Sequence, residues 1–308
     1  MEKIAYVFPG QGSQTVGMLA DLAAEHAIVT QTFSEASQVL GYDLWQLVQD
    51  GPAETLNETD KTQPALLTAS VAIWRAIEAT GVAKPEVLAG HSLGEYSALV
   101  CAGVIDFTDA VKLVELRGQL MQQAVPAGTG AMFAIIGLDN DAIQQACDDS
   151  AQGAVVSPVN FNSPGQVVIA GEKEAVERAA AACKEAGAKM AVALPVSVPS
   201  HCQLMKPAAD KLAEALAAIS FSAPSIKVIN NVDVAAPQTA QEIKDALVRQ
   251  LYCPVRWSET VEAMAAEGVT QLVEVGPGKV LTGLAKRINR SLGAKVANDP
   301  ASVAALSE

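Results

Sequence analysis

The segment that most constrains the fold is AGHSLGEYSAL at residues 89–99, where an apolar run changes abruptly into a helical pattern. Residues 86–90 are short, apolar and end in glycine, and the residues after the serine carry apolar side chains at helical spacing as far as Gly103. We therefore expect a strand, a sharp turn and a helix. A strand that leads into a helix in this way is typical of an α/β protein, in which helices pack on a parallel sheet.

The turn itself carries a candidate nucleophile. Gly90, Ser92 and Gly94 fit the pattern G-x-S-x-G, in which small residues flank a serine on a strained turn and its hydroxyl projects clear of the backbone. The turn also begins a helix, where unpaired N–H groups favour a negatively charged oxygen. Ser92 is therefore a candidate for attack on an acyl carbon, and the alternative is a tight strand-to-helix turn without chemistry.

A serine hydroxyl needs a base, and histidine is the most frequent one. Of the three histidines, His26 lies in an ordinary amphipathic stretch, and His91 is the immediate neighbour of Ser92, so its side chain points to the opposite face. His201 follows a predicted strand in a proline-interrupted loop, where functional side chains are frequent. We predict His201 as the base; the alternative is a capping or buried structural histidine. Cys202 is a weaker candidate nucleophile because the turn geometry belongs to Ser92.

The order of predicted elements changes twice along the chain. The first part has a strand at 4–8, helical patterns over 17–49 and 64–80, the turn, and a long amphipathic helix to about residue 125. The pattern then becomes β-α-β-β-α-β, the ferredoxin-like order, before helices and strands of the first kind resume near residue 200. We expect an α/β domain of residues 1–125 and 200–308, with residues 126–199 inserted as a smaller domain.

Composition and charge exclude several classes of function. A net charge of −13 argues against a nucleic-acid partner, which requires a basic surface. The sequence has no apolar run of 18 residues and no basic-then-apolar leader, so we expect no membrane span and a cytoplasmic location. Its five cysteines have no C-x-x-C spacing, so we expect neither a metal site nor a disulfide framework.

Several segments, in order along nearly the whole chain, resemble the malonyl-CoA:acyl carrier protein transacylases of bacterial fatty-acid synthesis. They are FPGQGSQTVGM (8–18), QPALLTAS (63–70), GHSLGEYSAL (90–99), RGQLMQ (117–122), PVSVPSHC (195–202) and EVGPGKVLTGL (274–284). The resemblance implies an α/β-hydrolase-like large domain with a parallel sheet and an inserted ferredoxin-like domain. It also implies a cleft between the two domains, in which Ser92 and His201 meet.

The resemblance assigns further roles in the reaction. An oxyanion hole needs two converging N–H donors; one would be the backbone N–H of Leu93, directly after the serine, and the other would come from Gln11 in the GQGSQ loop. The alternative for that loop is a glycine-rich turn alone, and a phosphate-binding loop is excluded because no lysine follows at the required spacing. The resemblance gives the main-chain carbonyl of Gln250 the task of orienting His201, and it places Gln63 near the site.

Arg117 would ordinarily be an exposed residue of the long helix. The resemblance makes it the group that binds the free carboxylate of a malonyl unit, and a guanidinium fork suits that task because it can bind a carboxylate through two hydrogen bonds. An acetyl group would leave the arginine buried and unpaired. Arg117 is therefore our candidate for substrate selectivity.

The charge of the C-terminal part is locally reversed. No acidic residue lies between Glu274 and Asp299, whereas five basic residues do: Lys279, Lys286, Arg287, Arg290 and Lys295. This pattern indicates either a solvated helical face or a surface that docks an anionic partner, for which the family offers acyl carrier protein and the phosphates of CoA. We single out Lys286 and Arg287 as docking candidates.

The predicted reaction is a transfer of the malonyl group from malonyl-CoA to the phosphopantetheine thiol of acyl carrier protein, through a malonyl-serine intermediate. It requires no cofactor of the enzyme's own, and we expect a monomer. The first alternative is a serine hydrolase or thioesterase acting on acyl-CoA, which would share the serine, the base and the oxyanion hole but would not need Arg117. The second is a binding module without catalysis, which would form no covalent adduct.

Overall fold

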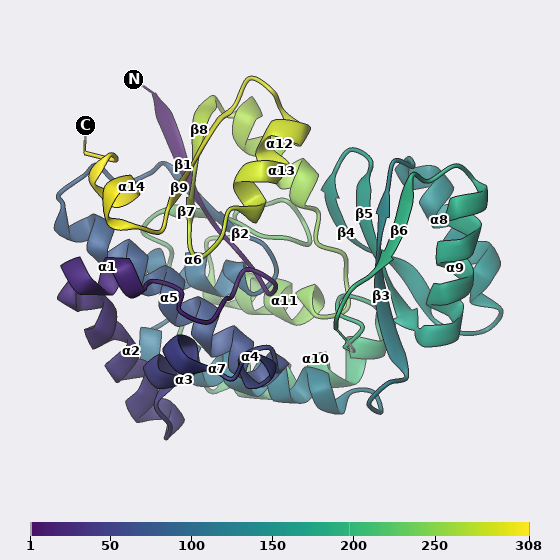
Figure 1. Ribbon diagram of the computed structural model, residues 1–308, viewed down its shortest axis with the longest axis horizontal. Helices are drawn as coiled ribbons and strands as arrows, with labels where there is room; N and C mark the ends of the chain where they lie inside the picture. The colour runs from purple at the N-terminus through teal and green to yellow at the C-terminus, as the bar shows by residue number, and fades with distance from the viewer. Residues whose placement is uncertain (1, 197, 308) are drawn as a thin grey trace.

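The protein is described here by a computed structural model that covers residues 2–196 and 198–307; residue 197, within the PVSVPSHC segment, lies outside the described residues. Two sheets organise the chain (Figure 1). The strands are β1 (Lys3–Phe8), β2 (Val87–Gly90), β3 (Gly130–Ile136), β4 (Val156–Ser163), β5 (Gln166–Glu172), β6 (Met190–Ala193), β7 (Lys227–Ile229), β8 (Val269–Val275) and β9 (Gly293–Ala297).

The helices cover both sheets and the connections between them. They are α1 (Ala20–Glu25), α2 (Ala27–Leu40), α3 (Leu44–Asp50), α4 (Ala53–Leu56), α5 (Thr59–Ala79), α6 (Gly94–Cys101), α7 (Phe107–Gln123), α8 (Asn140–Ala151), α9 (Lys173–Glu185), α10 (Lys206–Ala217), α11 (Ala240–Gln250), α12 (Trp257–Ala266), α13 (Val280–Ile288) and α14 (Pro300–Ala304), with a 3₁₀ turn at Gln203–Met205.

The larger sheet is parallel and has the strand order β7-β2-β1-β8-β9. Along β1, Tyr6 and Phe8 belong to one buried cluster, whereas Ala5 and Val7 belong to another on the opposite side. Because successive side chains of a strand point to opposite faces, helices cover this sheet on both sides. The α/β class expected from the strand–turn–helix segment is therefore confirmed.

The smaller sheet is antiparallel, with the order β4-β5-β3-β6, and lies beside the larger unit (Figure 1). Counted within this unit the order is 2-3-1-4, which is the ferredoxin-like arrangement predicted from the sequence. Helices α8 and α9 pack on one face, where Ile135 and Ile169 meet Ile143 and Val176. The opposite face carries Met132, which packs in one buried cluster with Cys202, the residue just before the 3₁₀ turn. The domain boundaries expected at residues 126 and 199 remain a prediction.

The N-terminal helical region is more divided than the sequence pattern indicated. The predicted helical stretch at 17–49 is three helices, because the chain is extended at His26 and adopts a left-handed conformation at Gly41, where φ is 79°. Helix α5 begins at Thr59, ahead of the predicted start at residue 64. Strand β9 at Gly293–Ala297, which pairs with β8 at the sheet edge, was not predicted from the sequence.

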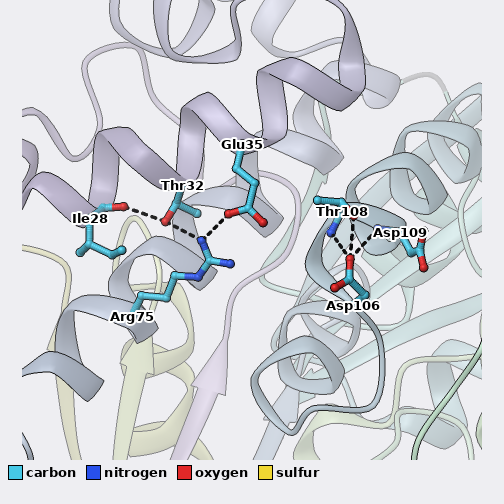
Figure 2. A network of polar contacts seen from close by, with 7 residues as sticks. All are labelled: Ile28, Thr32, Glu35, Arg75, Asp106, Thr108 and Asp109. Carbon is cyan, nitrogen blue, oxygen red and sulfur yellow. Dashed lines mark hydrogen bonds and ion pairs between the residues drawn. The ribbon is translucent and has the colours of Figure 1, made fainter.

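Two polar contacts fix the helices that carry the site (Figure 2). Arg75 of α5 donates to Glu35 of α2 at 2.7 Å and so joins these neighbouring helices. Asp106 caps α7: its carboxylate accepts from the Thr108 N–H at 2.9 Å, which satisfies a donor left free at the helix start. The cap therefore defines where α7 begins, and α7 is the helix that carries Arg117.

Candidate active site

Close packing around Ser92 shapes the turn between β2 and α6. Ser92 has a positive φ of 51°, a strained value for a residue with a side chain. A Cβ atom on Gly90 would lie 1.9 Å from the Gly94 carbonyl carbon, and one on Gly94 would lie 2.1 Å from the Phe8 carbonyl oxygen. Only glycine fits at these two positions, so the flanking residues of G-x-S-x-G allow the strand and helix to approach and leave the serine at the tip.

The structure brings Ser92 and His201 together. His201 Nε2 lies 2.7 Å from Ser92 Oγ, and His201 Nδ1 lies 2.6 Å from the main-chain oxygen of Gln250. Because a carbonyl oxygen can only accept, Nδ1 carries the proton and Nε2 is free to accept the serine proton. Burial, reinforced by the charge of Arg117, lowers the pKa of His201 to about 3. The imidazole is therefore neutral at pH 7, which is the state a general base requires.

Arg117 lies next to this pair and is almost fully buried, with 1% of its surface exposed. Its Nη1 donates to Gln63 Oε1 at 2.8 Å, and its Nη2 donates to Gln250 Oε1 at 3.0 Å and to Ser92 Oγ at 3.4 Å. The ion pairs among the described residues include none with Arg117. A buried guanidinium held by neutral oxygens can bind an incoming carboxylate strongly because water screens it little.

Two amide side chains, those of Asn231 and Gln250, hold the backbone of the turn, and neither side-chain role was predicted from the sequence. Asn231, just after β7, accepts from the Ser92 N–H at 2.8 Å and donates to the Gly90 carbonyl at 2.6 Å. The Gln250 side chain donates to the Ser92 carbonyl at 3.0 Å. The family resemblance implied only a main-chain role for Gln250, and a single sequence does not show which atoms of this residue reach the serine.

The proposed oxyanion donors line the same pocket as the serine. Gln11 and Leu93 both face it, and the Gln11 side chain donates to Thr59 Oγ1 at 3.3 Å. The Ser92 N–H is already engaged by Asn231, so the Leu93 N–H is the next donor along the helix start. A Cβ on Gly10 would lie 2.5 Å from a carbonyl oxygen of the turn, so glycine there lets the Gln11 loop press against the serine segment.

The pocket lies between the two sheets. Its walls come from both, because Met132 belongs to β3 and Asn160 to β4 of the smaller sheet, whereas Arg117 comes from a helix of the larger unit. Its lining residues are Gln11, Thr59, His91, Ser92, Leu93, Arg117, Met121, Met132, Asn160, Leu194, Val196, Val198, Ser200 and His201. Position between two structural units is typical of ligand sites.

The other sequence candidates take no part in the hydrogen bond between Ser92 and His201. His91 lines the same pocket, but its Nε2 contacts Asn162 Oδ1 at 2.7 Å. Burial raises the pKa of Cys202 to about 11, so its thiol stays protonated, and it donates to a backbone oxygen. Lys286 and Arg287 are exposed on the last turn of α13, outside the pocket.

Among residues 2–196 and 198–307, no three His, Cys, Asp or Glu side chains are grouped so that they could hold a metal ion. Within the same ranges, every helix is too short or too polar to cross a membrane. The five cysteine thiols are unpaired.

The serine hydroxyl is hydrogen-bonded to a neutral histidine, and a cationic group that can bind an anion lies beside it. This arrangement is typical of enzymes that form a covalent acyl-serine. Comparison with known proteins narrows this class. A family model for the acyl transferase domain matches residues 5–306, and the chain belongs to this family.

Full-length relatives agree with this placement. The malonyl CoA-acyl carrier protein transacylase of Escherichia coli K12 is 68% identical over 308 residues, covering 100% of both chains. A crystal structure of an acyl carrier protein S-malonyltransferase from Vibrio cholerae superimposes with a TM-score of 0.97 at 71% identity, covering 99% of each chain. A further solved structure, of a malonyl-transacylase in complex with a type II polyketide acyl-carrier protein, gives a TM-score of 0.98 at 66% identity over 99% of each chain.

Proposed function

We propose that the protein transfers the malonyl group of malonyl-CoA to the phosphopantetheine thiol of acyl carrier protein. The observation that carries this proposal is the position of Arg117: a buried cation, unpaired with any described carboxylate, stands 3.4 Å from the serine oxygen. A hydrolase of uncharged acyl groups has no use for such a group, and burying it costs free energy unless an anion binds. The full-length identity to malonyl transacylases supports the same function.

The first half-reaction forms an ester on Ser92. His201 accepts the hydroxyl proton as Ser92 Oγ attacks the thioester carbon, and the oxygen that becomes negative lies against the N–H groups of Gln11 and Leu93. Each such donor contributes about 3 to 4 kcal/mol to transition-state stability. The protonated imidazole is oriented by the Gln250 carbonyl and returns the proton to the departing CoA thiolate. A malonyl-serine ester and free CoA result.

The second half-reaction reverses these steps with a different thiol. The phosphopantetheine thiol of the carrier protein gives its proton to His201 and attacks the ester carbon, and Ser92 leaves with the returned proton. The two substrates use the same site in turn, so the kinetics are ping-pong. In both halves Arg117 holds the malonyl carboxylate, supported by the amide oxygens of Gln63 and Gln250.

The alternatives fit the observations less well. A thioesterase would share Ser92 and His201, but it would use water in the second half-reaction, and the relatives matched over their full length are transacylases. A binding module would not require a serine hydroxyl 2.7 Å from a neutral histidine nitrogen.

Several further features belong to the proposal. Lys286 and Arg287 form a docking surface for the carrier protein or for CoA, and residues 126–199 form the inserted domain that closes one side of the pocket. The reaction uses the chain's own serine and histidine, without a resident cofactor. The five free thiols are consistent with a reducing cytoplasm, and light scattering would test the monomeric state.

The decisive experiment incubates the enzyme with radioactive malonyl-CoA, with and without acyl carrier protein. Malonyl-carrier is the expected product, whereas free malonate as the main product would indicate a hydrolase. Without carrier protein, the label should remain on Ser92 and be lost in Ser92→Ala. A label that persists in this variant would mean that another residue is the nucleophile.

A further inference from the structure

Glu95 is a carboxylate buried beneath the serine, and the mechanism above does not use it. It lies in the first turn of α6, three residues after Ser92, with 2% of its surface exposed. Its Oε2 accepts from the main-chain N–H of Asn231 at 3.0 Å and from Gln250 Nε2 at 2.9 Å. Burying a carboxylate costs free energy unless hydrogen bonds compensate it. These two contacts supply such compensation at Glu95.

The Gln250 side chain joins Glu95 to Arg117. Its nitrogen faces three acceptors, namely Glu95 Oε2, the Ser92 carbonyl and, at 3.4 Å, Asn231 Oδ1. Its oxygen accepts from Arg117 Nη2 at 3.0 Å. An amide has donors at one end and acceptors at the other, so whatever fixes the nitrogen end also fixes where the oxygen points.

We propose that Glu95 is a positioning residue, whose acceptor oxygen sets the orientation of the Gln250 amide so that this amide holds Arg117 in place for the acyl carboxylate. Oxygen Oε2 is itself held by the Asn231 N–H, a backbone donor that cannot turn away. Arg117 donates to the Gln250 amide oxygen, and the Gln250 amide nitrogen donates to Glu95 Oε2. Glu95 Oε2 also accepts from the Asn231 N–H, so it is the common acceptor at the end of this chain of hydrogen bonds. Reversal of the amide would place its N–H groups against the guanidinium and two like donors would face each other.

Most of the support for the serine comes from other contacts, and the Gln250 side chain adds one hydrogen bond to the Ser92 carbonyl. Asn231 holds the Ser92 N–H and the Gly90 carbonyl through its side chain, and His201 is oriented by the Gln250 main chain. Loss of the Glu95 oxygen therefore weakens the grip on the acyl carboxylate more than it weakens attack by the serine. The inference rests on the proposed function, since it concerns selectivity for an acyl group that carries a carboxylate.

Two variants of Glu95 distinguish the effect of its acceptor oxygen from the effect of its charge. Glu95→Met has a similar length and removes the acceptor. Glu95→Gln removes the charge but keeps an oxygen that the Asn231 N–H can hold in the same place. Single-turnover formation of malonyl-serine and acetyl-serine from the two CoA thioesters, followed by mass spectrometry of the intact protein, gives the malonyl-to-acetyl preference of each variant.

We expect Glu95→Met to lower this preference about tenfold, the size expected for loss of a hydrogen bond to a charged group, and Glu95→Gln to restore it to within about threefold of the wild type. In an Arg117→Ala background, Glu95→Met should cause no further change in preference, because the two residues act through one contact. Equal losses for malonyl and acetyl transfer, or a Glu95→Gln variant as impaired as Glu95→Met, would overturn the proposal.

The reaction of the wild-type protein distinguishes a failure of this proposal from a failure of the proposed function. If the wild type forms malonyl-carrier and the Glu95 variants show no change in preference, only the role of Glu95 is wrong. Should Glu95→Met fail to fold, Gln250→Met makes the same test from the other side, since it keeps the main-chain carbonyl that orients His201. The same tenfold loss of preference is expected there, and an unchanged preference would again overturn the proposal.

Discussion

Arg117 Nη2 lies 3.4 Å from Ser92 Oγ, so the group proposed to select the substrate also touches the nucleophile. This cation donates toward the serine oxygen, and its charge adds to the effect of burial, which is the main cause of the lowered pKa of His201. A bound malonyl carboxylate would neutralise that charge within the same pocket. Selection of the acyl group and activation of the serine are therefore coupled through one guanidinium.

Arg117→Ala should lower malonyl transfer while relaxing the rejection of acetyl-CoA. A charged hydrogen bond to a carboxylate contributes about 1.5 to 3 kcal/mol, so kcat/KM for malonyl-CoA should fall at least tenfold. Comparison of kcat/KM for malonyl-CoA and acetyl-CoA measures the effect. Arg117→Lys is the matched variant, because it keeps the charge but loses the two-pronged geometry. An unchanged preference in both variants would exclude Arg117 from substrate selection.

His201 should make the protein less stable in acid. Its pKa is about 3 in the folded state and 6.5 as a reference value, so between these values the unfolded chain binds the extra proton. Stability is therefore lost as the pH falls below 6.5, by about 3 kcal/mol at pH 4.5. Urea unfolding of the wild type and His201→Gln over pH 4.5–7.5 gives this difference. Parallel pH dependences would contradict a strongly lowered pKa.

Glu95 should make the protein less stable as the pH rises, which is the opposite of the effect of His201. Burial raises its pKa to about 7 from 4.5. The hydrogen bonds from the Asn231 N–H and the Gln250 side chain oppose this shift, as does the charge of Arg117. The stabilising contribution of protonated Glu95 is fully present below pH 4.5 and is lost as the pH rises through 7. Relative to Glu95→Gln, the wild type should lose about 3 kcal/mol between pH 4.5 and pH 8. A constant difference in unfolding free energy across this range would mean that the pKa is not raised.

The sequence predicted the fold well where the pattern is local. The G-x-S-x-G turn and the β-α-β-β-α-β order depend on glycines and on alternating apolar residues, which a single sequence displays. The helical patterns over 17–49 did not show where one helix ends and the next begins, because these breaks depend on backbone conformations at His26 and Gly41. Edge strand β9 was not predicted because Gly293–Ala297 is partly exposed and lacks the continuous apolar run of a buried strand.

The polar network under the serine could not be predicted in this way. Asn231 and Gln250 come from segments far along the chain, and each contacts Ser92 through atoms that leave no periodic trace. Glu95 did offer a signal, since it is a charged residue in an otherwise apolar helix. Its meaning depends on which partners the fold brings to it, and these only the three-dimensional structure reveals.

The cap of α7 should contribute to stability without affecting selectivity. Asp106 accepts from the N–H groups of Thr108 and Asp109 (Figure 2), so Asp106→Ala should destabilise the protein by about 1 kcal/mol. Asp106→Asn is the matched control, because asparagine also caps helices well. Thermal unfolding measures the loss, and the malonyl-to-acetyl preference should stay unchanged. An alanine variant as stable as the wild type would mean that the cap is replaced by water or a neighbouring group.

Substitution of the basic residues of α13 tests whether they dock acyl carrier protein. Lys286 and Arg287 are exposed, and Arg287 also donates to Gln166 of β5 at 2.5 Å, so this helix turn touches the smaller sheet. Reversing both charges, by Lys286→Glu and Arg287→Glu, should raise KM for the acidic carrier protein several-fold more than KM for malonyl-CoA, because charge complementarity mainly serves association.

The controls for docking use the same assay. Lys211→Glu, on α10 away from α13 (Figure 1), changes an exposed lysine in the same way and should leave both KM values nearly unchanged. Added salt should reduce the difference between wild type and the double variant, because surface charges are screened within about 8 Å at physiological ionic strength. Equal increases in both KM values would mean that the residues serve CoA or the contact with Gln166 rather than the carrier protein.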